Sequence, residues 1–97
     1  MKILLTGSNG MVGKNILEHN TAHNYDFLTP SSKELNLLNY KDVKNYIAFN
    51  QPDFIIHSAG KVGGIQAIIK EPVSFLIDNI DMGRNIIMAA KENNIKN

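Results

Sequence analysis

Apolar residues along the chain form short clusters, separated by longer stretches in which they recur every three or four positions. The clusters at residues 3–5, 25–28 and 54–57 predict three short strands, and the first of them is apolar without alternation. That pattern is typical of a strand covered on both faces in a parallel sheet. Strands that alternate with helices pair in parallel through crossover connections. We therefore predict an α/β fold, a Rossmann-type doubly wound parallel sheet with the first strand central.

Three helices are predicted after these strands, and the first covers about residues 11–19. The second follows Asn39, whose side chain can cap a helix with Asp42 three residues on, and Pro52 closes it. One face of this helix is predicted to hold Val43, Tyr46, Ile47 and Asn50. Pro72 begins the third helix, which continues to about Glu92.

The third helix is apolar on two sides. One stripe steps by four and three positions and is predicted to pack on the sheet: Leu76, Ile80, Gly83, Ile87 and Ala90. The opposite side still has more apolar surface than a solvated face requires, and it holds Phe75, Asn79, Met82, Ile86 and Met88. Apolar surface of this kind often marks an interface. We therefore expect Ile86 to lie between subunits.

The predicted sheet is incomplete, because a doubly wound sheet continues with further strands beyond the first one. The 97 residues end on a helix, where the next strand is expected. We expect a domain truncated after its first three strands, in which the first strand lacks one neighbour and leaves an open, aggregation-prone edge.

Composition narrows the possible functions. The 97 residues carry a net charge of +1 without a basic block, which argues against nucleic acid and anionic membranes as partners. The absence of cysteine excludes disulfides and thiolate metal sites, and neither His19 nor His23 has a partner at metal-ligand spacing, so no metal is expected. The N-terminal apolar run is too short for a signal peptide, and no stretch approaches the roughly 18 apolar residues of a membrane helix. We expect a cytoplasmic protein.

Three glycines follow the first predicted strand at intervals of three residues. In a strand–turn–helix unit, the first allows a tight turn, the second lets the backbone approach a phosphate, and the third lets helix and strand pack together. The helix N-terminus adds free N–H groups and a partial positive charge. We predict that a dinucleotide pyrophosphate binds the loop of Gly7, Ser8, Asn9, Gly10, Met11, Val12 and Gly13. Residues 1–97 are then the N-terminal part of an NAD(P)-binding Rossmann domain.

The glycines have two other possible interpretations. A glycine-rich turn without a ligand stays open as the simpler alternative. A triphosphate-binding loop ending in Gly13-Lys14 is rejected, because that motif needs four residues between its first glycine and Gly-Lys, then Ser or Thr. Gly7 stands one residue too far away, and Asn15 replaces the hydroxyl residue that would bind magnesium.

The segment Thr6-Gly7-Ser8-Asn9-Gly10-Met11-Val12-Gly13 resembles the loop of the extended short-chain dehydrogenase/reductases, the sugar-nucleotide epimerase and dehydratase superfamily. Residues 34–38, Glu-Leu-Asn-Leu-Leu, and residues 59–65, Ala-Gly-Lys-Val-Gly-Gly-Ile, resemble the GDP-L-fucose synthase family in particular. Asn79 and residues 85–90 also fit that family. The resemblance covers nearly the whole chain and about the first third of such an enzyme.

The resemblance implies an NADPH-dependent epimerase/reductase of nucleotide-sugar biosynthesis that converts GDP-4-keto-6-deoxy-mannose to GDP-L-fucose. It implies a GDP-sugar substrate and a homodimer that pairs through the third helix and the catalytic helix. The family's catalytic Ser, Tyr and Lys, with a Cys and a His for epimerisation, are expected beyond this chain, which should be inactive alone. Another NAD(P)-dependent sugar-nucleotide epimerase/dehydratase and a non-catalytic dinucleotide-binding regulator remain alternatives.

The cofactor type is predicted from the end of the second strand, where an NAD site normally has an acidic residue. Residues 29–33, Thr-Pro-Ser-Ser-Lys, offer hydroxyls and a cation, which suit the 2′-phosphate of NADP better than a repelling carboxylate. The resemblance implies an adenosine-phosphate segment of Ser32, Lys33, Glu34, Leu35, Asn36 and Leu37. Asn9 and Ser32 stand where familiar members carry arginine, so only a modest preference for NADPH is expected. A solvated loop at Ser31, Ser32 and Lys33 is the alternative.

The end of the third strand is predicted to border the same ligand, because ligands of open α/β sheets lie beyond the carboxyl ends of the strands. Ser58, Ala59 and Gly60 are small enough to leave room for adenosine and ribose. His57 is expected to be a packed, hydrogen-bonded histidine rather than a catalytic base. Lys61 either reaches the substrate side or is a solvated loop residue.

Overall fold

The computed structural model describes residues 1–19, 21–59 and 72–95. Its three strands, β1 (Lys2–Thr6), β2 (Asp26–Leu28) and β3 (Phe54–His57), form one sheet in the order β2-β1-β3. Both pairings are parallel, and Leu4 of β1 lies opposite Leu28 on one side and Ile55 on the other. A parallel sheet with the first strand in its centre confirms the predicted fold class.

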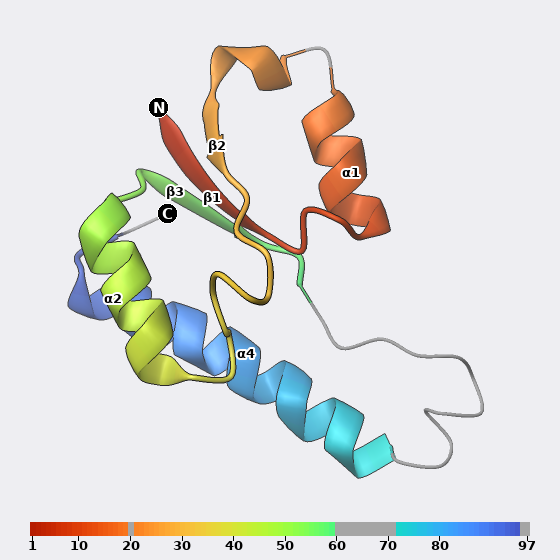
Figure 1. The fold of residues 1–97 in the computed structure, drawn as a ribbon, viewed down its shortest axis with the longest axis vertical. Helices are drawn as coiled ribbons and strands as arrows, with labels where there is room; N and C mark the ends of the chain where they lie inside the picture. The colour runs from red at the N-terminus through yellow and green to blue at the C-terminus, as the bar shows by residue number, and fades with distance from the viewer. Residues whose placement is uncertain (20, 60–71, 96–97) are drawn as a thin grey trace.

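The helices cover both faces of this sheet. They are α1 (Met11–Glu18), the short 3₁₀ helix η1 (Ala22–Asn24), α2 (Tyr40–Asn50) and α4 (Pro72–Glu92). Figure 1 shows α1 on one face and the α2–α4 pair, packed side by side, on the other. The connection through α1 runs from β1 to β2, and the connection through α2 runs in the opposite direction, from β2 past β1 to β3. Right-handed connections in opposite directions place these two helices on opposite faces.

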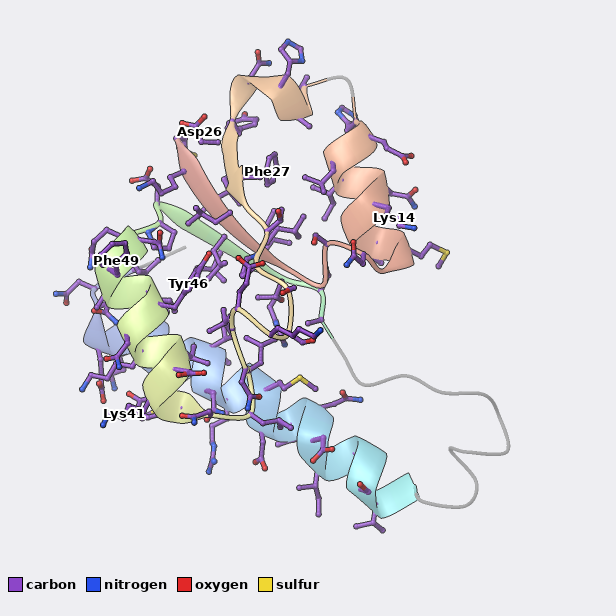
Figure 2. All side chains as sticks on the ribbon, in the orientation of Figure 1. Lys14, Asp26, Phe27, Lys41, Tyr46 and Phe49 are labelled. Atoms are coloured by element: carbon purple, nitrogen blue, oxygen red, sulfur yellow. The ribbon has the colours of Figure 1, made fainter. Side chains whose placement is uncertain are left out.

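The capping interaction predicted for α2 is present. The side-chain oxygen of Asn39 accepts a hydrogen bond from the backbone N–H of Asp42 at 3.1 Å, which satisfies one of the free donors at the start of the helix. Val43 and Ile47 are fully buried. Figure 2 shows Lys41 pointing away from the sheet side of α2. The capping residue and the proline therefore predicted the bounds of this helix, and the spacing of its apolar residues predicted its buried face.

The main core lies between the sheet and the α2–α4 pair. It brings together side chains from the central strand, the loop after β2 and both helices: Leu4, Leu35, Val43, Ile47, Ile86 and Ala89. None of the described helices is both long enough and apolar enough to cross a membrane.

The faces predicted for α4 are wrong. Leu76, Ile80 and Ile87 are 60%, 58% and 68% exposed, whereas Ile86 and Ala89 are only 5% and 0% exposed. Ile86 is therefore a core residue in contact with the α2 side, and not a subunit contact. Because α4 is apolar on both sides, hydrophobic spacing alone does not select the side that packs. The side chain of Phe75, assigned to the other face, lies outside the described ones.

The open edge was also assigned to the wrong strand. β1 pairs on both sides, with β2 and with β3, so it has no free edge. The edges of this three-stranded sheet belong to β2 and β3. The central position of the first strand, which the strand–helix alternation predicts, is incompatible with the open edge that we expected for it.

Candidate dinucleotide-binding site

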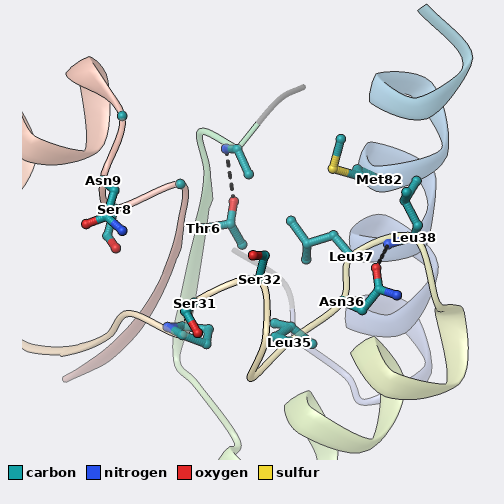
Figure 3. A pocket seen from close by; sticks show the side chains of 14 residues that line it. Thr6, Ser8, Asn9, Ser31, Ser32, Leu35, Asn36, Leu37, Leu38 and Met82 are labelled. Carbon is teal, nitrogen blue, oxygen red and sulfur yellow. Dashed lines mark hydrogen bonds between the residues drawn. The ribbon is translucent and has the colours of Figure 1, made fainter. Parts of the chain in front are cut away.

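A cavity of about 400 Å³ opens at the carboxyl ends of β1 and β3. These two strands are neighbours, yet the described helices that come next in the chain, α1 after β1 and α4 after β3, lie on opposite faces of the sheet. Such a topological switch point is where open α/β sheets bind their ligands. The described lining comes from the glycine loop, the segment after β2, the end of β3 and α4: Thr6, Gly7, Ser8, Asn9, Gly10, Pro30, Ser31, Ser32, Leu35, Asn36, Leu37, Leu38, Ala59 and Met82. Figure 3 shows Ser8 and Asn9 on one side of it and Leu37, Leu38 and Met82 on the other.

The glycine loop is a tight turn that leads directly into α1. Gly7 has φ +71°, and its carbonyl accepts a hydrogen bond from the N–H of Gly10 at 3.0 Å. A positive φ of this size is easily adopted only by glycine. α1 then begins at Met11 with neither a side-chain cap at Gly10 nor an acidic residue in its first turn. Its first N–H groups are therefore available to an anion.

The three glycines differ in how much room surrounds them. A Cβ at Gly13 would lie 2.2 Å from the Gly7 carbonyl oxygen, and one at Gly7 would lie 2.7 Å from the backbone of Ala59. A Cβ at Gly10 would meet only the Gly7 oxygen, at 3.4 Å. Packing therefore requires glycine at positions 7 and 13. At position 10 a larger residue would fit within the protein, so packing does not explain why Gly10 is a glycine. This is the difference expected when the second glycine faces a phosphate.

The segment after β2 forms the second wall through a turn stabilised at both ends. The Glu34 carboxylate accepts from the Ser31 N–H at 3.1 Å, and the Ser31 hydroxyl accepts from the Glu34 N–H at 3.3 Å. This reciprocal arrangement has the hydrogen-bond pattern of a capping box, here closing a turn and not starting a helix. Glu34 and Lys33 are exposed and do not line the cavity. The hydroxyl residues Ser31 and Ser32 do line it.

α4 supports this wall from behind. Asn85 is 3% exposed, and its side-chain amide donates to the carbonyl oxygen of Leu37 at 2.8 Å. Met82, one turn earlier on α4, lines the cavity directly. A buried amide that loses such a partner costs about 1–3 kcal/mol, so Asn85 fixes the position of the Leu37 backbone relative to α4.

The ends of β1 and β3 are joined through Thr6, which is 2% exposed. Its hydroxyl accepts from the N–H of Ala59 at 3.2 Å and contacts His57 Nδ1 at 2.7 Å. Its carbonyl accepts from the Ser58 N–H at 3.2 Å and from the Ser58 hydroxyl at 2.6 Å. His57 is hydrogen-bonded as expected, although its side chain is exposed rather than packed. Partial desolvation lowers the pKa of the imidazole from its usual value of 6.5.

The structure brings most of the predicted site residues to one cavity. The predicted residues that line it are Gly7, Ser8, Asn9, Gly10, Ser32, Leu35, Asn36, Leu37 and Ala59. Those that do not are Met11, Val12, Gly13, Lys33, Glu34 and Ser58. Gly60 and Lys61 lie outside the described residues. Four lining residues were missed: Thr6, Pro30, Leu38 and Met82. Thr6, Pro30 and Leu38 lie next to or near predicted site segments in the sequence, and this position is the only feature that indicated them. Met82 is on α4, far from those segments, and no sequence feature indicated it.

The sequence also contains a Tyr-x-x-x-Lys pattern that we did not predict as a site, and it lies away from the cavity. Tyr40 and Lys44 on α2 have the Tyr-x-x-x-Lys spacing of a reductase proton relay. Neither lines the cavity, and Lys44 is paired with Glu92 at 3.1 Å. Interaction with the Glu92 carboxylate raises the pKa of Tyr40 above its ordinary value of 10.0. A proton donor at neutral pH requires the opposite shift. Lys44 joins α2 to α4 through Glu92, and neither residue of the pair is placed for catalysis at the cavity.

Comparison with known proteins agrees with this geometry. The model of the NAD dependent epimerase/dehydratase family matches residues 3–97. The chain belongs to this family. Family membership confirms the resemblance drawn from the glycine loop and from residues 34–38.

Individual relatives are similar over nearly the whole chain. GDP-L-colitose synthase of Yersinia pseudotuberculosis is 58% identical over 96 residues, which are 99% of this chain and 31% of that protein. GDP-L-fucose synthase of Azorhizobium caulinodans is 40% identical over 89 residues, 92% of this chain and 28% of that protein. The chain thus spans less than a third of the length of these curated relatives.

A solved structure extends the likeness to the fold. The crystal structure of a GDP-L-fucose synthetase from Naegleria fowleri bound to NADP superimposes with a TM-score of 0.76 at 28% identity, over 98% of this chain and 28% of that one. The three-stranded sheet and its helices therefore match part of a nucleotide-sugar enzyme of known structure.

Proposed function

We propose that this chain is the NADP-binding part of an enzyme that epimerises and reduces a GDP-linked keto sugar in nucleotide-sugar biosynthesis. The observation that carries the proposal is the position of the glycine loop. Its open second glycine borders a cavity at the switch point of the sheet and directly precedes the uncapped start of α1. A loop of this geometry binds a dinucleotide pyrophosphate.

The cofactor is proposed to lie across the cavity. The N–H groups of Met11, Val12 and Gly13 and the open surface of Gly10 would hold the pyrophosphate. The adenosine would lie between Ala59 and the apolar wall of Leu35 and Leu37. The hydroxyls of Ser31 and Ser32 and the nearby ammonium of Lys33 support binding of a 2′-phosphate, and the NADP in the Naegleria fowleri structure agrees with this choice. When bound, NADPH supplies a hydride.

The proposed substrate is GDP-4-keto-6-deoxy-mannose, with GDP-L-fucose as product. The names of the two curated relatives leave a second candidate of the same class, the keto sugar that yields GDP-L-colitose. In either case we place the catalytic Ser, Tyr and Lys beyond residue 97, in the cytoplasmic full-length enzyme, because no tyrosine is among the described residues that line the cavity.

The full-length enzyme is expected to oxidise NADPH when GDP-4-keto-6-deoxy-mannose is added, with kcat/KM for NADPH roughly tenfold above that for NADH. One added contact to a 2′-phosphate is worth about 1.4 kcal/mol, or a factor of ten. Steady-state kinetics with both nucleotides, and product analysis for GDP-L-fucose and GDP-L-colitose, measure this.

Three outcomes would change the proposal in different ways. Higher kcat/KM with NADH would refute the assignment of NADP. Turnover only with the precursor of GDP-L-colitose would replace the substrate and keep the reaction class. Tight NADPH binding without turnover of either sugar would favour the dinucleotide-binding regulator.

We further propose that the full-length enzyme is a homodimer that pairs through the exposed apolar side of α4. Val73, Leu76, Ile77 and Ile80 are each at least half exposed there, which is more apolar surface than a single helix leaves in water. The change Ile80→Glu is expected to weaken the dimer at least tenfold, because it places a charge among apolar groups. Phe49→Glu on α2, where Phe49 is 89% exposed, is the matched control. Sedimentation velocity of a wild-type monomer at micromolar concentration would contradict the dimer.

A further inference from the structure

His57 does not line the cavity, yet it contacts the residue that joins the cavity's two strands. Its Nδ1 lies 2.7 Å from the hydroxyl oxygen of Thr6. That oxygen also lies 3.2 Å from the backbone nitrogen of Ala59. Thr6 and Ala59 both line the cavity. The imidazole is therefore connected to the cavity wall by hydrogen bonds that pass through a single residue, Thr6.

Chemistry fixes the direction of the hydrogen bond from Ala59, and the tautomer of His57 sets the direction of the other. A backbone N–H is only a donor, so the Thr6 oxygen accepts from Ala59. The single hydroxyl proton of Thr6 is then free to be donated to His57 Nδ1, which accepts when the imidazole is neutral and carries its proton on Nε2. His57 thereby fixes the rotation of the hydroxyl and directs a lone pair of its oxygen at Ala59.

The position of Ala59 matters for the glycine loop. A Cβ at Gly7 would be 2.7 Å from both the nitrogen and the Cα of Ala59, so the two backbones are already in close contact. Gly7 has its φ of +71° at the point where it packs against Ala59. A displacement of Ala59 would change the wall of the cavity and remove the support behind the first turn of the loop.

We propose that His57 is a positioning residue for dinucleotide binding, acting through the Thr6 hydroxyl to hold Ala59 against Gly7. This role rests on the proposed function of the cavity. It requires neither contact with the cofactor nor proton transfer. It requires only an acceptor at the position of Nδ1.

The experiment compares two variants of His57 in the full-length protein by titration with NADPH. His57→Phe keeps a planar ring and removes the acceptor, whereas His57→Asn places an amide oxygen near the position of Nδ1. We expect His57→Phe to raise the Kd for NADPH about tenfold, and His57→Asn to stay within about twofold of wild type. Both should leave kcat at saturating NADPH within about twofold, because the reacting atoms are not touched.

The chain offers a matched control in a second histidine–threonine pair. His19 Nδ1 lies 3.0 Å from the Thr21 hydroxyl oxygen, away from the cavity. His19→Phe removes a similar hydrogen bond and should leave the Kd unchanged. Equal weakening by His19→Phe would show that loss of any such pair has this effect, and would overturn the proposal.

The remaining outcomes separate the inference from the function on which it rests. Wild-type affinity in His57→Phe, or equal weakening in His57→Phe and His57→Asn, overturns the positioning role alone. Failure of the wild type to bind NADPH or NADH refutes the proposed function. If His57→Phe does not fold, Thr6→Val and Thr6→Ser decide the question. The serine variant keeps the hydroxyl and should bind as wild type, while weak binding by both contradicts the role of the hydroxyl.

Discussion

Replacing Gly10 with valine is expected to abolish dinucleotide binding in a protein that stays folded. The backbone of Gly10 has φ −78° and ψ 172°, which any residue adopts. A Cβ there meets only the Gly7 carbonyl oxygen, at 3.4 Å. The branched side chain would occupy the space in which a pyrophosphate approaches the backbone. The Kd for NADPH should rise at least about a hundredfold, with a thermal midpoint close to that of the wild type.

The matched variant is Gly13→Ala, which adds less volume three residues away. Its Cβ would lie 2.2 Å from the Gly7 oxygen and 2.7 Å from the Ser8 Cα, both backbone atoms that cannot move aside cheaply. This variant should lose the fold of the loop and much of the stability. Calorimetry and NADPH titration on both variants separate the two roles. Unchanged affinity in Gly10→Val would show that the phosphates do not bind on this loop.

The change Ile86→Glu should destabilise the protein by about 4 kcal/mol or more, since it removes a buried side chain and places a carboxylate in the core. Ile86 is 5% exposed and packs among Leu4, Val43, Ile47 and Ala89. The control is Met88→Glu, two residues away on the same helix.

Met88 is 46% exposed, and a change there should stay within about 0.5 kcal/mol of wild type. Chemical denaturation measures both variants. If Ile86→Glu dissociates a dimer without loss of stability, the original prediction that Ile86 lies between subunits is right, and the packing of α4 described above is wrong.

The sequence predicted those elements in which one local signal was decisive. For α2, Asn39 and Asp42 fix the start and Pro52 fixes the end. Val43, Tyr46 and Ile47 recur on one side, so bounds and buried face were both correct. The glycine loop was also predicted from a local signal, the spacing of its three glycines after an apolar strand. Gly13 is required by backbone atoms of the loop itself, and Gly7 by backbone atoms at the end of the adjacent strand.

The parts that were missed depend on contacts between distant segments. α4 is apolar on both sides, and the side that packs is selected by Ile86 against α2 and by the hydrogen bond from Asn85 to Leu37, 48 residues away. Met82 lines the cavity for the same reason. Thr6 was missed because its partners belong to β3. No pattern along a single segment contains these pairings.

The hydrogen bonds between β1 and β3 continue past both ends of the paired strands. At the start, Lys2 and Asp53 exchange two of them, at 2.8 and 2.9 Å, and at the other end Thr6 binds Ser58 and Ala59. β2 has three residues, of which Asp26 is exposed. In local unfolding, segments with few buried contacts open first and well-bonded segments open together. Because their hydrogen bonds continue past both ends of the strands, we expect β1 and β3 to open together, and the base of the cavity with them.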